Sequence, residues 1–389
     1  MLDTVVLVMH EGYTIQNPDR FEPSARILTE GSGYMGGRGY MQCKQNPTKS
    51  ELKAGFYKPR LTLTKRFTNF GTFGLSLKIE LSLPKLIYGN NFDELNDSDF
   101  DKVLDKLQQR LKSMDVLVFK HVLANTLISS VHYSKNIPIT DGRRPKYWMD
   151  KIAEANISKI LDTNQVDYRN EGHLFKTHTN SFEIAFYDKI KDLEMSKISS
   201  KRSYENDNEI QLDLFDELKN RKAFFEVLRM EVRLNKRQKI NSIFKKLYIF
   251  KEPTFQNIFS SEISVKVLLY YLDKIREKRP AIFDYRITST KKFLTETIIS
   301  NPNIGANRLF QILGAKLAFD EFGMRETRNI LDKYSNRSWY RLVNQIKNVK
   351  YPNRIDPLTE IRNKLLTYDA LDLIDYKNHL INNDKNETN

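Results

Sequence analysis

Carboxylates, a phenol and cationic side chains recur at every second position in two segments of this sequence. In residues 181–189 (SFEIAFYDK), the polar positions include Glu183, Tyr187 and Lys189. In residues 227–235 (VLRMEVRLN), the charged positions are Arg229, Glu231 and Arg233. A period of two predicts that these side chains share one face of each β-strand, opposite an apolar face.

A histidine on a third predicted strand completes a set of possible metal ligands. His132 lies on the same face as Ser130 and Ser134. If the strands pair in one sheet, its polar face gathers His132, Glu183 and Glu231. A hard cation such as Mg²⁺ or Mn²⁺ prefers oxygen ligands and accepts one imidazole. Each residue also has a structural interpretation, since Glu231 between two arginines is typical of an ion pair and His132 of a hydrogen-bonded sheet histidine.

This set of residues suits metal-assisted cleavage of a phosphodiester. A tyrosine hydroxyl can attack phosphorus and retain the 5′-phosphate as a covalent ester, which conserves the bond energy for rejoining. We favour Tyr187 as this nucleophile because of its face, with Tyr248 and Tyr133 as alternatives. Lys189, Arg229 and Arg233 could hold the non-bridging oxygens. A sheet tyrosine that only binds its neighbours is a nearly equal interpretation of Tyr187.

The positive charge of the chain is concentrated in one region. The formal net charge is +14, from 63 lysines and arginines against 49 acidic residues. Residues 221–251 contain ten of these cations, with only Glu226 and Glu231 opposing them and with aromatic residues interleaved. Such a pattern can neutralise phosphates and stack unpaired bases, so it favours DNA or RNA over a merely solvated helix face. The cations of the cluster are Arg221, Lys222, Arg229, Arg233, Lys236, Arg237, Lys239, Lys245, Lys246 and Lys251.

A second basic and aromatic stretch lies at residues 336–351 (NRSWYRLVNQIKNVKY). Its helical spacing is equally compatible with a recognition helix and with a packing helix. As a recognition helix it would present Trp339 and Arg341 to nucleic acid.

The elements that must position these residues divide the chain in two. Strands are expected at 4–9, 57–67, 73–83, 126–134, 178–187 and 224–235, and helices at 97–125, within 141–170 and at 210–220. After Pro253 the apolar spacing is helical. We therefore predict an α+β fold, an antiparallel sheet with helices on one face, over residues 1–252. Residues 253–389 are predicted to form a helical domain for DNA binding or an accessory role, with a disordered tail.

Composition excludes several other classes of protein. With 389 residues, of which 40% are hydrophobic, the chain can bury a sizeable core and is not disordered throughout. The single cysteine, Cys43, excludes a disulfide scaffold and a cysteine-rich zinc site. We find no signal peptide and no apolar run of the roughly 18 residues that a membrane helix needs. A cytoplasmic protein without membrane contact is expected.

Several of these segments resemble, in the same order, the replication initiators of the filamentous-phage gene II/X family, which also occur on plasmids. The Tyr187, Lys189 and Glu194 pattern and the R-x-E-x-R segment also resemble the wider group of plasmid rolling-circle initiators. The resemblance spans residues 55–346, and the matching stretches are 57–95, 128–137, 178–194, 227–239 and 323–346.

The resemblance implies a fold like that of rolling-circle nickases and a sequence-specific endonuclease that cuts one strand of a double-stranded origin. Such proteins use a divalent metal, leave a 3′-hydroxyl for the host polymerase, and later cut again to circularise the displaced strand. Origin DNA, double-stranded and single-stranded, is the implied partner, and a host helicase could bind the helical half. Relatives carry a tyrosine shortly after R-x-E-x-R, where this sequence has Gln238, and often an aspartate where it has His132.

Two alternatives remain open at this point. The Gln238 departure is compatible with a DNA-binding regulator of replication or transcription that lacks nicking activity. A transposase or relaxase-like nickase would use the same chemistry as an initiator. An RNA-binding role has less support, since the sequence shows no aromatic signature of an RNA-recognition motif.

Overall fold

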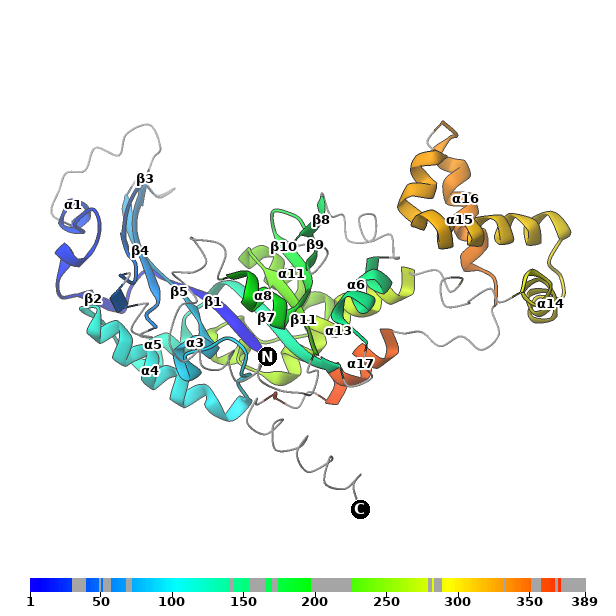
Figure 1. Ribbon diagram of the computed structural model, residues 1–389. Coiled ribbons are helices and arrows are strands. Elements are labelled where there is room, and N and C mark those ends of the chain that lie inside the picture. The colour runs from blue at the N-terminus through cyan, green and yellow to red at the C-terminus, as the bar shows by residue number, and fades with distance from the viewer. Residues whose placement is uncertain are drawn as a thin grey trace, which may run out of the picture.

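The computed structural model of this chain is shown in Figure 1. It describes residues 1–29, 40–48, 50–51, 57–67, 72–139, 143–153, 165–169, 174–196, 226–278, 282, 289–331, 333–350, 358–367 and 370–371. Arg221 and Lys222 of the basic cluster, the helix predicted at 210–220, and the tail predicted to be disordered lie outside the described residues.

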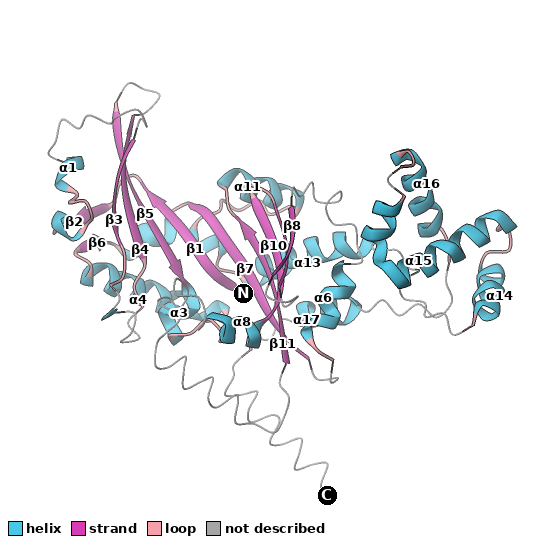
Figure 2. Cartoon of the chain, turned by 45° about the horizontal axis from the view of Figure 1, so that its top comes forward, coloured by secondary structure: helices cyan, strands magenta, loops and turns pink. Residues whose placement is uncertain are grey.

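One large antiparallel sheet dominates the amino-terminal part of the chain (Figure 2). Among the described residues it has nine strands, in the order β3-β4-β5-β1-β7-β11-β10-β9-β8. Every neighbouring pair is antiparallel, so the predicted α+β class with an antiparallel sheet is confirmed. The strands are β1 (Leu2–Met9), β3 (Tyr40–Gln45), β4 (Arg60–Phe67), β5 (Phe73–Ser82), β7 (Ile128–Ile139), β8 (Gln165–Arg169), β9 (Leu174–His178), β10 (Phe182–Asp188) and β11 (Glu226–Leu234).

Alternation along the strands gives the sheet one apolar face and one polar face. On β11, Leu228, Met230 and Val232 are fully buried in the core. The residues between them, among them Glu231, point to the other face. Residues directly opposite each other in paired strands share a face, so the register carries the polar face from β11 onto β7, β1, β5, β4 and β3.

Helices supply the other half of the hydrophobic core. Apolar residues of several helices belong to the same hydrophobic cluster as the apolar face of the sheet. For example, the ring of Phe182 in β10 stacks on that of Tyr271, with ring centroids 5.5 Å apart. Two shorter helices, α3 (Leu83–Tyr88) and α8 (Lys189–Ser196), directly follow β5 and β10. The core helices are α4 (Phe100–Ser113), α5 (Lys120–Asn125), α6 (Pro145–Ala153), α11 (Arg237–Lys246), α12 (Phe255–Ile258), α13 (Ser261–Lys278) and α17 (Leu358–Thr367).

The single helix predicted at 97–125 is wrong. The chain instead forms α4, a short strand β6 (Val116–Val118) and α5. Asp115, just after the Met114 cap of α4, has the left-handed conformation, with φ of 58°. The following Val-Leu-Val run then pairs with β2 (Tyr13–Ile15) in a small second sheet. A helical period at 97–125 conceals this break, because short apolar strands and helical segments share the same residue types.

A second hydrophobic cluster lies in the carboxyl-terminal part. It is built from α14 (Thr290–Ser300), α15 (Ala306–Ile330) and α16 (Asn336–Lys347). Gly323 interrupts α15 with φ of 76°, a value that glycine adopts without steric cost. The division between the two hydrophobic clusters does not coincide with the predicted domain boundary between residues 252 and 253. The first cluster extends through α13 and includes α17, because the apolar faces of these helices pack with the sheet.

Within the described residues, no helix has both the length and the apolar character needed to cross a membrane.

Candidate metal centre

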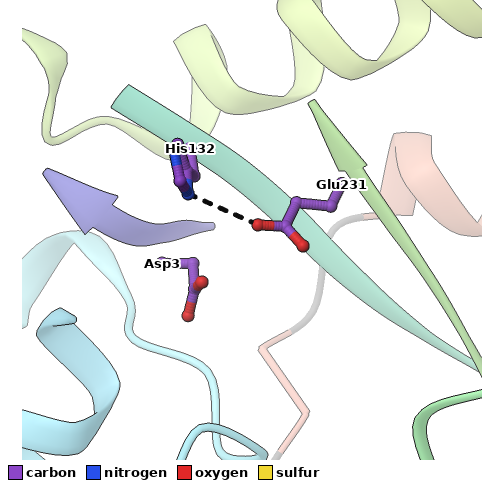
Figure 3. Close-up of side chains that lie close together, drawn as sticks. All are labelled: Asp3, His132 and Glu231. Atoms are coloured by element: carbon purple, nitrogen blue, oxygen red, sulfur yellow. Dashed lines mark ion pairs between the residues drawn. The ribbon is translucent and has the colours of Figure 1, made fainter. Parts of the chain in front are cut away.

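Three side chains that could bind a metal ion converge at the middle of the sheet. Asp3, His132 and Glu231 come from β1, β7 and β11, which are adjacent strands (Figure 3). One ligand atom of each lies within 4.8 Å of the others. Two carboxylates and one imidazole form a donor set that suits Mg²⁺ or Mn²⁺. Two of the three predicted ligands, His132 and Glu231, are therefore brought together.

Asp3 reaches this face because β1 is irregular at its start. The pairing of β1 with β7 shifts register between Leu2 and Thr4, and such a bulge re-aims the extra side chain. The Oδ1 atom of Asp3 is buried and accepts no hydrogen bond, although Nη2 of Arg229 lies 3.1 Å away. A buried carboxylate oxygen without a hydrogen-bond donor fits a metal ligand.

Glu231 is the most strongly engaged residue of the group. Its Oε1 accepts from Nε of Arg233 at 2.9 Å, and its Oε2 accepts from Nη2 of Arg233 at 3.0 Å. Nδ1 of His132 lies 3.5 Å from Oε1. Burial tends to raise the pKa of Glu231, but the charge of Arg233 and hydrogen bonds from His132 and Arg233 outweigh it and hold this pKa well below its usual range. Glu231 is therefore a carboxylate at neutral pH.

Tyr187 meets this group directly. Its hydroxyl donates a hydrogen bond of 3.1 Å to Oε2 of Glu231. Burial, and next the negative charge of Glu231, raise the pKa of Tyr187 well above its usual value. The hydroxyl is therefore protonated at rest and lies beside the candidate metal ligands.

Lys189 lies close to Tyr187 at the start of α8. Its Nζ is 5.9 Å from the centroid of the Tyr187 ring and donates to Oδ1 of Asn91 at 3.1 Å. Burial, followed by the charge of Arg229, lowers the pKa of Lys189 to about 7. Its amine therefore changes protonation near neutral pH.

Two predicted roles on this face need correction. Glu183 lies outside the metal-binding group, because its carboxylate is held by Nζ of Lys176 at 2.6 Å and by Nη1 of Arg233 at 2.9 Å. Arg229 is only 2% exposed and donates to protein oxygens of Asn91, Ser134 and Asn136. It positions protein groups around Asp3 and does not face a nucleic acid.

Of the two alternative nucleophiles, Tyr133 is buried in the hydrophobic core. The other, Tyr248, and most of the predicted phosphate contacts lie away from the candidate metal ligands. Tyr248 follows α11, has φ of 55° and is 79% exposed. Lys239 lies over the ring of Phe182, 4.0 Å from its centroid. The remaining cations predicted to bind nucleic acid are exposed, and they are Lys236, which caps α11, and Arg237, Lys245 and Lys246 on α11.

The helix α16 has one residue that packs in the core and one that is accessible, so it has features of both a packing helix and a recognition helix. Trp339 is buried against Phe319, with ring centroids 6.2 Å apart, so its predicted role in binding nucleic acid is wrong. Arg341, two residues later, is exposed. Trp339 is thus a packing residue, while Arg341 is accessible.

Sequence reasoning missed Asp3. The residue precedes a plain apolar strand, and its face follows from a bulge that period-two counting does not anticipate. An acidic residue beside the first apolar positions was the only available signal.

Comparisons with known proteins leave the family open: no family model matches the chain, and no curated protein or solved structure matches it significantly.

Proposed function

We propose that this protein is a metal-dependent DNA nicking and joining enzyme that initiates rolling-circle replication of a phage or plasmid. The observation that carries the proposal is the hydrogen bond from the Tyr187 hydroxyl to Glu231, a member of the Asp3, His132 and Glu231 group. A nucleophile, a candidate metal site and neighbouring cations thus share one sheet face. The ordered resemblance to phage and plasmid initiators supports the same class.

The proposed reaction is a transesterification at phosphorus. The bond from Tyr187 Oη to phosphorus forms while the bond from phosphorus to the 3′-oxygen breaks, and that oxygen takes up a proton. Lys189, with a pKa of about 7 and its Nζ 5.9 Å from the centroid of the Tyr187 ring, is the base that would take up the phenolic proton and return a proton to the leaving 3′-oxygen. A divalent ion held by Asp3, His132 and Glu231 would polarise the phosphate and stabilise its developing charge. Attack of a 3′-hydroxyl on the tyrosyl ester reverses the reaction and rejoins a strand.

The cationic surface outside this group has a role in the same proposal. The exposed cations of α11 would bind origin DNA, and Arg341 of α16 would contact the origin duplex. The freed 3′-hydroxyl would pass to a host polymerase, and the carboxyl-terminal helices could receive a host helicase.

The direct assay is nicking of supercoiled DNA from the replicon that encodes the protein. We expect open-circular product with Mg²⁺ or Mn²⁺, none with a chelator, and no covalent protein–DNA complex from Tyr187→Phe. If the protein binds DNA but nicks no fragment of that replicon, the proposed nicking activity is contradicted.

That negative result would support the second candidate, a DNA-binding regulator. The observation in its favour is that Arg233 contacts both oxygens of Glu231, which leaves this carboxylate less available to a metal. A regulator would show salt-dependent origin binding and no metal-dependent product.

A further inference from the structure

The helix α16 has an apolar face and a polar face. It shares one hydrophobic cluster with α14 and α15, and the three helices lie together in Figure 2. Trp339 and Ile346 are buried in this cluster, so they define the packing face. The exposed residues on the other side are Arg337, Arg341, Asn344 and the capping residue Asn348. Their intervals of three or four residues place them along one side of the helix, and we call them the polar stripe.

The two arginines of the polar stripe have no acidic partner. Residues 333–350 contain no aspartate or glutamate. Within the part of the chain that the structure describes, the side chains of Arg337 and Arg341 form no ion pair and no hydrogen bond. The stripe therefore presents two available guanidinium groups beside two amide side chains, a surface that attracts a polyanion.

The polar stripe ends at a cavity of about 260 Å³, which we call the stripe pocket. Asn348 lines this pocket together with Arg308 of α15 and Lys350. Nη2 of Arg308 donates to the carbonyl oxygen of Gln345 at 3.0 Å, so its charge meets a neutral partner. Asn301, also in the lining, accepts from the backbone N–H of Lys350 at 2.9 Å and donates to its carbonyl oxygen at 2.8 Å. Among the described residues that line the pocket none is acidic, so the pocket suits a phosphate group.

The side chains of the polar stripe are of the types that read base edges in double-stranded DNA. Arginine forms paired hydrogen bonds with guanine, and asparagine forms them with adenine. The major groove of B-DNA is about 12 Å wide and admits an α-helix. The stripe itself contains no aromatic ring, whereas a surface for unpaired bases depends on stacking. Double-stranded DNA therefore fits this face better than a single strand does.

The elements that precede α16 support the same ligand. Gly323 divides α15, and only residues 331–335 separate the end of α15 from the start of α16. Ser335 caps α16, because its side chain accepts from the backbone N–H of Ser338. A helix, a short connection and a second helix that carries the contacts is the order found in helix-turn-helix proteins, in which the second helix enters the major groove.

We propose that α16 binds in the major groove of the origin duplex, where the polar stripe reads the base sequence and the stripe pocket holds a phosphate of the backbone. The inference rests on the function proposed above and adds to it how the origin is recognised. Arg341 then determines specificity, whereas Lys350 contributes an affinity that is the same for every sequence.

The test measures sequence preference without cleavage. The full chain, with a chelator and no added metal, selects from a library of duplexes whose random core covers about ten base pairs, one turn of B-DNA. The preferred duplex and a scrambled duplex are then titrated with the wild type and three variants at several salt concentrations. The variants are Arg341→Ala in the polar stripe, Lys350→Ala in the stripe pocket, and the control Lys291→Ala at an exposed position of α14 that lies in neither. Thermal unfolding checks that each variant is folded.

We expect Arg341→Ala to lower affinity for the preferred duplex about 5-fold to 150-fold and to relax the preference at one base pair, since a bidentate base contact discriminates by this much. Its affinity for the scrambled duplex should change far less. Lys350→Ala should weaken binding to both duplexes by the same factor and lower the salt slope by about 0.9, as one lost phosphate contact does for B-DNA. The control should keep the wild-type preference and salt slope.

Three results would overturn the inference. They are the absence of any preferred duplex, an unchanged base preference in Arg341→Ala, and equal binding of the preferred sequence as a single strand. Because the assay needs no catalysis, its failure differs from failure of the proposed nicking. If the wild type nicks its replicon while Arg341→Ala keeps the wild-type preference, the proposed function stands and the role of α16 does not.

Discussion

At the scale of single residues, the choice between Asp3 and Glu183 decides what the site can do. Both are carboxylates near Glu231, but only Asp3 joins His132 and Glu231 within 4.8 Å. Glu183 is neutralised by Lys176 and Arg233. Asp3 also has a cationic partner, since Nη2 of Arg229 lies 3.1 Å from its Oδ1, so what distinguishes Asp3 from Glu183 is its position beside His132 and Glu231.

Metal binding by variants separates these two carboxylates. We expect Asp3→Asn to weaken Mn²⁺ binding by at least about 10-fold, since even outer-shell partners contribute about 10-fold to 100-fold. Glu183→Gln should retain affinity within a few-fold. Calorimetric titration of the full chain with Mn²⁺ measures both affinities. A larger loss of affinity in Glu183→Gln than in Asp3→Asn would show that Glu183, and not Asp3, is the metal ligand.

Lys189 predicts a pH dependence of stability. In the folded chain its pKa is about 7, whereas an exposed lysine has a pKa of about 10.4. Between these values the unfolded chain binds more protons, so this residue makes stability rise with pH. Below pH 7 both states are protonated and the burial penalty is at its full size.

Replacement by methionine should remove this dependence. From pH 7 to pH 9, the free energy of unfolding of the wild type should rise by about 2–3 kcal/mol relative to Lys189→Met. Urea titrations of both proteins at both pH values give this difference. An equal change in the free energy of unfolding of the two proteins would show that the pKa of Lys189 is not lowered in the folded chain.

At the scale of elements, the strands were the most predictable part of the chain. Period-two alternation located β5, β10 and β11 and the faces of Glu231 and Tyr187 correctly. The pairing of distant strands is not a local property, so the meeting of β1, β7 and β11 could not be predicted. The break at Asp115 and the bulge at Asp3 depend on backbone geometry that apolar spacing does not encode.

Substitutions of Tyr248, which follows α11, test whether this residue has only a structural role or is the nucleophile. Its φ of 55° is unfavourable for a residue with a Cβ atom. Tyr248→Gly should raise the free energy of unfolding by about 0.5–1 kcal/mol and leave nicking intact. Tyr248→Ala removes the same ring without the conformational relief, and is the control. Loss of nicking in both variants would make Tyr248 the nucleophile.

At the scale of the whole molecule, the sheet shares one core with three helices that follow residue 252, which are α12, α13 and α17. Leu268 and Tyr271 of α13 and Leu365 of α17 are buried in the cluster that contains the strands. Helical spacing identified α13 as a helix but could not show which surface it covers, because an apolar face packs equally well on a helix or a sheet.

A fragment of residues 1–252 should therefore not fold cooperatively. It lacks the apolar surface of α12, α13 and α17, and single Leu→Ala changes in such cores already cost about 2–5 kcal/mol. Circular dichroism during urea titration and limited proteolysis of the fragment and the full chain make the comparison. A cooperative transition in the fragment would support the boundary predicted from sequence.

The central claim is that Tyr187 attacks a DNA phosphate beside the candidate metal centre. The most direct measurement is peptide mapping by mass spectrometry after incubation with Mg²⁺ or Mn²⁺ and single-stranded fragments covering the replicon. We predict a nucleotide attached to Tyr187 through its 5′-phosphate. An adduct on Tyr248 or another residue, or no adduct with any fragment that binds, would contradict the claim.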